Sequence, residues 1–379
     1  MTAQKCNTSR KLSYPSMFNS HYYCVIMAGG MGSRFWPISR REKPKQFLDF
    51  TASGTSFLRL TYDRFKDIVP EENILVVSLE RYKDLVMEHL PELPEKNLLL
   101  EPYSRNTAPC FTFATYTILK RDPLAVMVVS PADHVISGKD LFKDAMDSAL
   151  AVAAREDSII TLGVIPTRPD TNFGYIQTSD STTTDRPVKI KTFTEKPDVE
   201  LAQVFLDSGE FYWNSGIFIG RASAIRDELE KHVPEITNLW KGWKDALDTP
   251  KQTEFLQRVY SDIPMISIDY GVMEKTSNAW VLPAHFKWAD IGNWDSLYEY
   301  LSTHDENGNA SNLVGKSLVK DCSNNVLYSG GKKKLTAIRG LENYIVIDTQ
   351  NALLICPRDQ EKFKEFLSEL AMPEFSEYR

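Results

Sequence analysis

A glycine-rich segment followed by a cluster of cations is the part of this sequence whose residue types most clearly indicate chemistry. The segment reads VIMAGGMGSRFWPISRREKPKQFLDF, from Val25 to Phe50, and it starts within a short apolar run. Between residues 34 and 45, five basic side chains accompany a single acidic one, Glu42. Glycines let backbone N–H groups approach phosphate oxygens closely, and arginine and lysine bind phosphate by charge. The segment therefore predicts a site for a specific phosphate-bearing ligand.

The glycine spacing does not match either of two better-known phosphate-binding motifs. A dinucleotide fingerprint needs a third glycine where this chain has Phe35, and the GxxxxGK[ST] pattern of a P-loop is absent. An NAD-dependent dehydrogenase is therefore disfavoured. Three glycines alone would be equally consistent with a plain tight turn, and Lys45 alone with a solvated surface lysine. Arg34 and Lys45 together favour the anion site.

Composition and charge narrow the classes of protein further. The chain has 379 residues, a net charge of −7 and a hydrophobic content of 42%, which argues against a general nucleic-acid surface. No apolar run approaches the roughly 20 residues of a membrane span. Five cysteines with no CxxC pair favour a reduced, cytoplasmic protein without a zinc site. Residues 1–20 lack the apolar region of a secretory signal, so we expect a disordered leader there.

Short apolar strands alternate with helical periodicity in the first half of the chain. This pattern predicts an α/β fold with a Rossmann-like, mostly parallel sheet flanked by helices, whose ligands lie at the carboxyl ends of the strands. Beyond residue 310, short β runs separated by turn residues predict a second, small β-rich domain over 310–379 that ends in a helix near 359–370. We expect strands at 22–27, 73–78, 97–101, 125–130 and 158–164, and further helices near 198–208, 223–231 and 235–247.

Several motifs, in order along the chain, resemble one enzyme family. GGMGSRFWPISRREKPKQF is similar to the signature of sugar-nucleotide pyrophosphorylases, and EPYSRNTAP, PADH, FTEKP, WNSGIF, SIDYGVMEKT and WADIGNWDSL follow with the spacing of mannose-1-phosphate guanylyltransferases. The resemblance covers residues 22–303 and implies a nucleotidyltransferase domain over 21–305. It also implies a left-handed β-helix-like C-terminal domain and a homodimer.

The reaction implied by this resemblance joins GTP and mannose 1-phosphate to give GDP-mannose and pyrophosphate. The sugar phosphate would attack the α-phosphate in line, so positioning and charge neutralisation would suffice without a covalent intermediate. One alternative is transfer from dTTP or UTP to glucose 1-phosphate. Another is a regulatory subunit that binds sugar nucleotides without turnover. Such a subunit is expected to have lost Lys45, Asp133 or Asp290, and this chain has all three.

The resemblance also implies roles for particular residues. Arg34 would stabilise the leaving pyrophosphate, Lys45 would contact the α-phosphate, and Asp133 would act with Asp290 as the ligands of Mg²⁺. Simpler interpretations are a helix N-cap for Asp133 and a turn aspartate for Asp290. The triphosphate would lie on Ala28, Gly29, Gly30, Gly32 and Ser33. The base or ribose would contact Glu101, Asn106 and Thr107. Mannose 1-phosphate would contact Gly174, Glu195, Lys196 and Asn214.

Overall fold

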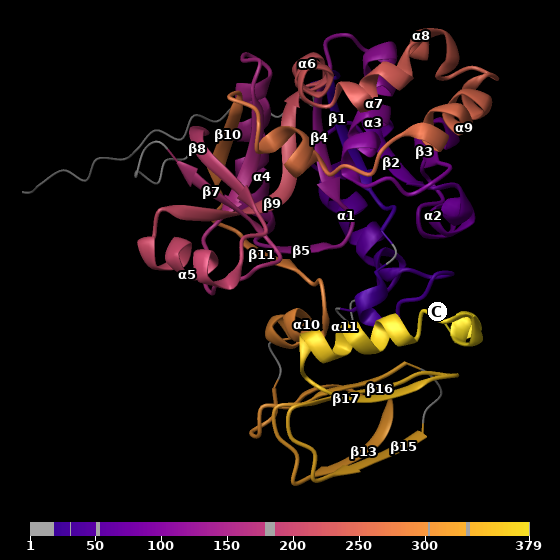
Figure 1. Cartoon of the computed structure of the whole chain (residues 1–379), viewed down its shortest axis with the longest axis vertical. Coiled ribbons are helices and arrows are strands. Elements are labelled where there is room, and N and C mark those ends of the chain that lie inside the picture. Colours follow the sequence, from indigo (N-terminus) through magenta and orange to yellow (C-terminus); the bar gives the residue numbers. More distant parts are fainter. Residues whose placement is uncertain are drawn as a thin grey trace, which may run out of the picture.

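The computed structural model describes residues 19–30, 32–50, 54–178, 186–301, 304–330 and 334–378. The predicted leader at 1–20 lies outside these residues except for its last two, so it stays a prediction. Figure 1 shows a larger α/β body and a smaller β-rich body, with helices α10 (Trp294–Tyr300) and α11 (Gln360–Glu369) between them. Within the described residues, none of the helices has both the length and the apolar character that crossing a membrane requires.

The larger body is built on a nine-stranded sheet with the order β3-β2-β1-β4-β9-β6-β10-β8-β7. The strands from β3 to β4 are mutually parallel, as predicted, and so are β6 and β10. Strand β9 runs antiparallel to β4 and β6, so the complete sheet is mixed. The strands are β1 (Tyr22–Met27), β2 (Ile74–Leu79), β3 (Leu98–Glu101), β4 (Val126–Pro131), β6 (Ile159–Val164), β7 (Gly174–Thr178), β8 (Val188–Glu195), β9 (Phe211–Arg221) and β10 (Ala279–Pro283).

Helices cover both faces of this sheet. One face packs on α3, α6, α7 and α9, and the other packs on α1, α2 and α4. Because both faces are covered, the central strands are apolar on both sides, and β2 is buried along its whole length. The helices are α1 (Phe57–Lys66), α2 (Lys83–His89), α3 (Thr107–Arg121), α4 (Lys139–Ala153), α5 (Val199–Ser208), α6 (Ala222–His232), α7 (Pro234–Thr237), α8 (Trp243–Ala246) and α9 (Gln252–Asp262).

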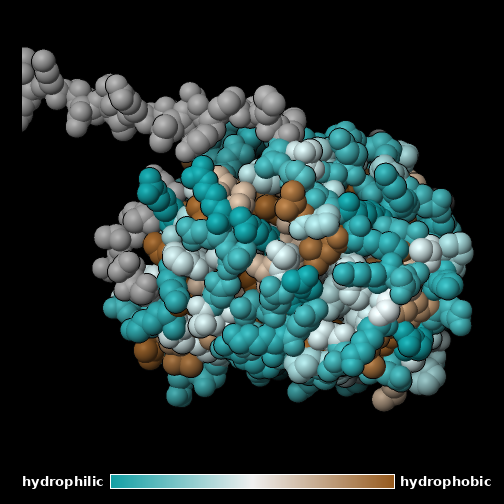
Figure 2. All heavy atoms as spheres, turned by 90° about the horizontal axis from the view of Figure 1, so that it is seen from above, coloured by the Kyte–Doolittle hydropathy of each residue, from teal (hydrophilic) through white to brown (hydrophobic). Residues whose placement is uncertain are grey.

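Two local predictions differ from the structure. The helix expected over 235–247 is interrupted, because a 3-10 turn over Asn238–Trp240 and the positive φ of Gly242 separate α7 from α8. Helix α9 was not predicted at all. Its apolar residues Phe255, Leu256 and Val259 have helical spacing, which was the available signal. Figure 2 shows the face of the larger body that lies away from the β-rich domain as mostly hydrophilic, with scattered apolar side chains.

The C-terminal domain has the stacked parallel strands of a β-helix. Strands β12, β14 and β16 pair in parallel, β13 pairs in parallel with β15, and β17 closes the first set antiparallel. Buried Asn309 and Asn325 hydrogen-bond each other at 2.7 Å at one corner of successive coils. The strands are β12 (Ala310–Asn312), β13 (Gly315–Lys320), β14 (Val326–Ser329), β15 (Lys334–Arg339), β16 (Tyr344–Asp348) and β17 (Leu353–Pro357).

Candidate active site

The glycine loop, residues 28–34, leaves β1 at the carboxyl edge of the parallel strands. Gly32 has φ +59°, and a Cβ there would lie 2.6 Å from the Cβ of Lys45, so only glycine fits. The Gln46 side chain donates to the carbonyl of Ala28 at 2.8 Å and to that of Gly30 at 3.0 Å. Carbonyls held in this way face the protein. Gln46, in the PKQ segment at residues 44–46, therefore helps to fix the conformation of the described part of the loop. The sequence did not reveal this contact.

Lys45 lies between the two carboxylates that were predicted to hold a metal. Its Nζ is 2.8 Å from Asp133 Oδ2 and 3.4 Å from Asp290 Oδ1, and the lysine is only 3% exposed. Burial alone would raise the pKa of Asp133, but the charge of Lys45 and its hydrogen bond lower that pKa to about 2. Asp133 is therefore an anion at any ordinary pH. A solvated surface lysine does not fit this geometry.

The carboxylates of Asp133 and Asp290 converge because two strands pair. Asp133 immediately precedes β5 (His134–Ser137), and Asp290 ends β11 (Lys287–Asp290), which is antiparallel to β5 with Asp290 opposite His134. The Nε2 of His134 is 4.0 Å from Asp133 and 3.9 Å from Asp290, while its Nδ1 is 3.3 Å from Trp288 Nε1. This ribbon brings together residues about 160 positions apart in sequence.

This pair of carboxylates fits Mg²⁺ better than a metal enclosed by protein ligands alone. Among the described residues, no group of three or more His, Cys, Asp or Glu side chains is arranged to hold a metal. Mg²⁺ is commonly held by one or two carboxylates, with substrate phosphates and water completing its coordination. Asp133 and Asp290 keep 35% and 28% of their side chains exposed, so phosphate oxygens can reach them.

Arg34 belongs to a short 3-10 turn, Ser33–Phe35, and its side chain is exposed. A Cβ built on Gly292 would lie 3.7 Å from Arg34 Nη1, which puts the guanidinium beside the residues that follow Asp290. Gly30 has open space where a Cβ would be, and Ser33 is exposed. The predicted triphosphate contacts therefore surround one accessible edge, and their roles stay predictions.

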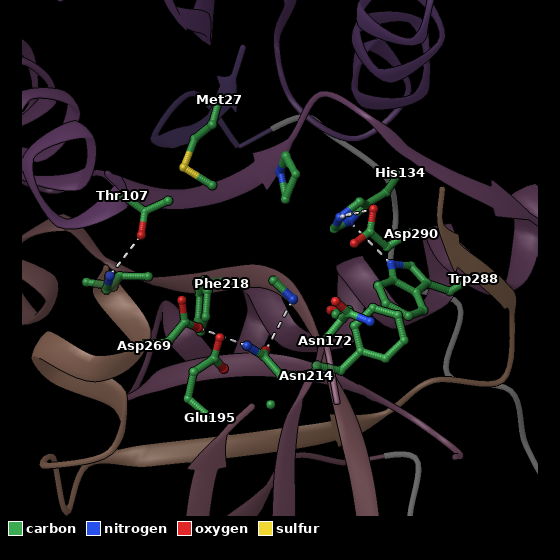
Figure 3. Close-up of a pocket in the computed structure, with 16 residues that line it drawn as sticks. Met27, Thr107, His134, Asn172, Glu195, Asn214, Phe218, Asp269, Trp288 and Asp290 are labelled. Carbon is green, nitrogen blue, oxygen red and sulfur yellow. Dashed lines mark hydrogen bonds and ion pairs between the residues drawn. The ribbon is translucent and has the colours of Figure 1, made fainter. Parts of the chain in front are cut away.

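A pocket of about 170 Å³ adjoins this edge and contains most of the predicted sugar contacts (Figure 3). Asp290 and His134 lie at one end, and Glu195 and Asn214 lie at the other. Gly174 pairs with Glu195 across β7 and β8, and a Cβ on Gly174 would lie 2.6 Å from Glu195 Oε2. Glycine at 174 therefore makes room for the carboxyl group of Glu195.

Asp269 also lines this pocket, and the sequence analysis gave it no role. It begins a π-helical turn, Asp269–Met273, and accepts a hydrogen bond from Asn214 Nδ2 at 3.0 Å. Burial, and then the neighbouring Glu195, raise the pKa of Asp269 to about 7. Burial also raises the pKa of Glu195, whose Oε2 has no hydrogen-bond partner within the described chain. Near neutral pH, the carboxyl group of Asp269 can therefore both donate to and accept from hydroxyl groups.

Lys196 is half exposed and forms an ion pair with Glu195, with 3.0 Å between Lys196 Nζ and Glu195 Oε1. It adopts φ 48°, which is unusual for a residue other than glycine. Thr107 lines the pocket, and its hydroxyl accepts a hydrogen bond from the backbone N–H of Ile268 at 2.8 Å. Through this bond, Thr107 holds the segment that carries Asp269.

Glu101, predicted to contact the base, is buried beneath the glycine loop. Its Oε1 accepts from the hydroxyl of Tyr260 at 2.9 Å, and a Cβ on Gly29 would lie 3.5 Å from its Oε2. Burial raises the pKa of Glu101 to about 8, so at neutral pH the side chain is mostly an uncharged acid. An uncharged acid is a poor partner for the two adjacent N–H donors of guanine. The predicted base contact stays untested and has little geometric support.

Asn106 is exposed and caps α3 by accepting from the backbone N–H of Thr107 at 2.9 Å. A second cavity, of about 490 Å³, lies beyond the carboxyl ends of β2 and β3. Its lining residues include Arg81, Tyr103 and Ser104 but neither Glu101 nor Asn106. This cavity lies at strand ends next to the strand that carries the glycine loop, the edge at which ligands of such sheets bind.

The protonation of Glu101 predicts a pH-dependent stability. The folded state keeps this proton up to about pH 8, whereas an unfolded chain loses it near the usual pKa of 4.5. Between these two pH values, the folded chain therefore binds more protons than the unfolded chain. Stability therefore falls as pH rises through this interval, and the Glu101→Gln variant lacks that contribution. We expect the unfolding temperature of the unsubstituted chain to fall relative to that of Glu101→Gln between pH 5 and 8, measured by calorimetry.

The matched control is Glu95→Gln. Glu95 is exposed, is 2.6 Å from Lys83, and has a lowered pKa, so its contribution is already complete above about pH 5. The difference between the unsubstituted chain and Glu95→Gln should stay flat from pH 5 to 8. A flat difference for Glu101→Gln as well would show that Glu101 is ionised when folded.

Comparison with known proteins gives the family. The nucleotidyl transferase family matches residues 23–307, and a mannoseP isomerase/GMP-like β-helix domain matches residues 315–370. The second match agrees with the stacked strands of the C-terminal domain. Both predicted parts of the fold, the nucleotidyltransferase body and the β-rich C-terminal domain, are thus confirmed.

Individual relatives extend over most of the chain. A Klebsiella pneumoniae protein named mannose-1-phosphate guanylyltransferase is 36% identical over 364 residues, which are 94% of this chain and 76% of the relative. The xanthan biosynthesis protein XanB of Xanthomonas campestris is 37% identical over 350 residues, 91% of this chain and 72% of that protein. A crystal structure described as mannose-1-phosphate geranyltransferase from Thermus thermophilus matches with a TM-score of 0.80 at 29% identity, covering 93% of this chain and all of that one. The chain therefore belongs to the nucleotidyl transferase family, together with relatives that include mannose-1-phosphate guanylyltransferases.

Proposed function

We propose that this protein is a mannose-1-phosphate guanylyltransferase, which makes GDP-mannose and pyrophosphate from GTP and mannose 1-phosphate. The observation that carries the proposal is the position of Lys45. It is buried beside the glycine loop and contacts both Asp133 and Asp290. Asp290 in turn lines one end of a pocket whose other end presents Glu195 and Asp269. This arrangement joins a phosphate site to a polyhydroxyl site. The names of the relatives support GTP and mannose 1-phosphate as the specific substrates.

In the proposed reaction, the chain binds and orients two polyanions that repel each other. The glycine loop and Arg34 hold the β- and γ-phosphates, which depart as pyrophosphate. Lys45 turns from the carboxylates toward the α-phosphate and stabilises the charge that develops there. Asp133 and Asp290 would hold Mg²⁺, which would supply charge neutralisation at the phosphates. No covalent enzyme nucleophile is required.

Sugar recognition in this proposal depends on Glu195, Asp269 and Asn214. Their oxygen and nitrogen atoms meet at one end of the pocket, where a hexose could fill much of the space (Figure 3). Sites that hydrogen-bond a hydroxyl discriminate strongly against sugars that present it differently. Lys196, next to Glu195, would pair with the phosphate of the sugar.

A substrate matrix tests the proposal. Purified protein with Mg²⁺ would be given GTP, dTTP, UTP or ATP, each with mannose 1-phosphate or glucose 1-phosphate, and pyrophosphate release would be followed. We expect the highest kcat/KM with GTP and mannose 1-phosphate. Best turnover with dTTP or UTP and glucose 1-phosphate would replace our assignment with the alternative transferase. Tight binding of GDP-mannose without turnover of any pair would indicate a regulatory subunit.

Metal removal gives a separate prediction. Activity should disappear in EDTA and return with excess Mg²⁺. The Asp290→Asn variant should lose roughly 10²-fold in turnover at a fixed Mg²⁺ concentration, because one anionic ligand is gone. Asp140→Asn, which changes an exposed aspartate of α4, is the control and should behave like the unsubstituted chain. Full activity in chelator would contradict the metal assignment.

We also propose a cytoplasmic location and a homodimer. The four cysteines of the described chain, Cys24, Cys110, Cys322 and Cys356, are free thiols, which supports a reducing compartment. Exposed apolar side chains on the C-terminal domain support self-association there: Leu318, Leu335, Leu353 and Ile355. Sedimentation velocity of the full chain would report a single species of twice the chain mass if the dimer forms.

A further inference from the structure

Trp36, two residues after Arg34, packs against the C-terminal segment of the chain. The indole Nε1 of Trp36 donates a hydrogen bond to the backbone carbonyl of Tyr378 at 2.6 Å, although 342 positions separate the two residues. The Trp36 ring also meets Phe366 of α11 edge-on, with 6.1 Å between ring centroids. Figure 1 shows α11 directly below the N-terminal segment of the larger body. The phosphate-binding edge and the C-terminus are therefore in direct contact.

A single apolar cluster extends this contact under the active site. It combines Phe35 and Trp36 with Val135 of β5 and Ile291, the residue after Asp290. The same cluster includes side chains of the β-helix and of α11, so both bodies share one core. Its C-terminal members are Val326, Ile345, Ile347, Leu354 and Phe363. Each of three residues of the proposed site is thus one or two positions in sequence from a side chain of this cluster. These residues are Arg34, Asp133 and Asp290.

We propose that the C-terminal segment, α11 with the 3-10 turn Pro373–Tyr378, is a positioning element for the glycine loop and acts through Trp36. A loop of glycines and exposed residues cannot fix its own geometry, because glycine leaves the backbone free. Gln46 holds the loop from the sheet side. Trp36, two residues after Arg34 and only 8% exposed, holds it from the side of the C-terminal domain. The C-terminal domain therefore completes the nucleotide site.

This inference rests on the proposed function in one respect: the nucleotide used to measure binding is the one that gives the highest turnover in the substrate matrix. The Trp36→Phe variant keeps an aromatic ring but loses the N–H donor. A chain ending at Met372 loses the acceptor carbonyl of Tyr378. We expect each change to weaken equilibrium binding of the nucleotide about fivefold, the effect of one hydrogen bond. A chain that carries both changes should bind nucleotide as tightly as the weaker-binding of the two single variants, because both changes remove the same hydrogen bond.

Two further measurements separate positioning from simple stability. Unfolding temperatures are recorded with and without nucleotide, and Trp243→Phe serves as the control. Trp243, on α8, stacks on Tyr116 with 4.7 Å between ring centroids, and α8 lies on the far side of the larger body from α11 (Figure 1). This control should bind nucleotide normally whatever its effect on stability.

The outcomes are distinguishable. Unchanged nucleotide affinity in Trp36→Phe and in the shortened chain, with only lower unfolding temperatures, would overturn the positioning role. Additive losses in the combined variant would overturn the shared contact. If the unsubstituted chain binds nucleotide but turns over no substrate pair, the proposed function fails, while this inference is still tested by the binding measurements. If the unsubstituted chain binds no nucleotide, both are wrong.

Discussion

The Lys45→Met variant is expected to lose roughly 10²- to 10³-fold in kcat, the usual effect of removing one preorganised donor from a transition state. Methionine fills a similar volume but carries no charge. Lys45 is the one cation that contacts both Asp133 and Asp290 within the part of the chain that the structure describes. Without it, the two carboxylates meet without a lysine to compensate their charge, and in the proposed mechanism the α-phosphate loses a positive partner. Steady-state pyrophosphate release at saturating substrates would measure the loss.

Lys43→Met is the matched control, because Lys43 belongs to the same basic segment but is exposed. It should keep turnover within about twofold, since exposed charges contribute little. Circular dichroism and the unfolding temperature would show whether Lys45→Met is still folded. A folded Lys45→Met enzyme with near-normal kcat would show that the lysine is a structural counter-ion and not a catalytic residue.

The parallel half of the sheet could be predicted because its strands are short, apolar and buried on both faces. Tyr22–Met27 was predicted with its observed limits, and β2 and β4 differ from prediction by one residue at each end. Asp133 and Asp290 could be paired only through the family resemblance. Their meeting depends on the β5–β11 ribbon, and neither strand was predicted. Pairing between distant strands leaves little local signal in a sequence.

Contacts made by single side chains were harder to predict. Gln46 and Trp36 stand inside the recognised signature, yet their partners, the loop carbonyls and the carbonyl of Tyr378, are backbone atoms that any residue would supply. Glu101 ends strand β3, where ligand contacts were expected, but its side chain turns into the protein toward Tyr260. Asp269 was visible in the SIDYGVMEKT motif, and only the pocket indicated what it could do.

In the candidate site, each lysine lies against carboxylates whose negative charge it compensates. Lys45 compensates Asp133 and Asp290, and Lys196 compensates Glu195. Asp269, next to Glu195, is the group whose pKa rises to about 7, because burial and then the charge of Glu195 raise this pKa more than Lys196 lowers it. Binding of anionic substrates would redistribute these pairs, so the chain can hold buried charges before its ligands arrive.

The Gly32→Ala variant is expected to lose roughly 10²-fold in turnover, because displacing a catalytic group by about 1 Å has an effect of this size. The added Cβ would lie 2.6 Å from Lys45 Cβ and 2.8 Å from Ser39 Oγ, so Lys45 must move. The backbone at Gly32 also has φ +59°, which costs a residue with a Cβ about 1 kcal/mol. Turnover and unfolding temperature would be measured on the same preparation.

Gly209→Ala separates these two effects. Gly209 has φ +68° at the end of α5, but nothing lies within 4 Å of its added Cβ. It should therefore show the same backbone cost, about 1 kcal/mol in unfolding free energy, with normal turnover. Equal turnover in the two variants would mean that the loop adapts without moving Lys45. A large loss confined to Gly32→Ala would show that the glycine loop and Lys45 act as one packed unit, in which the conformation of the loop sets the place of the charge.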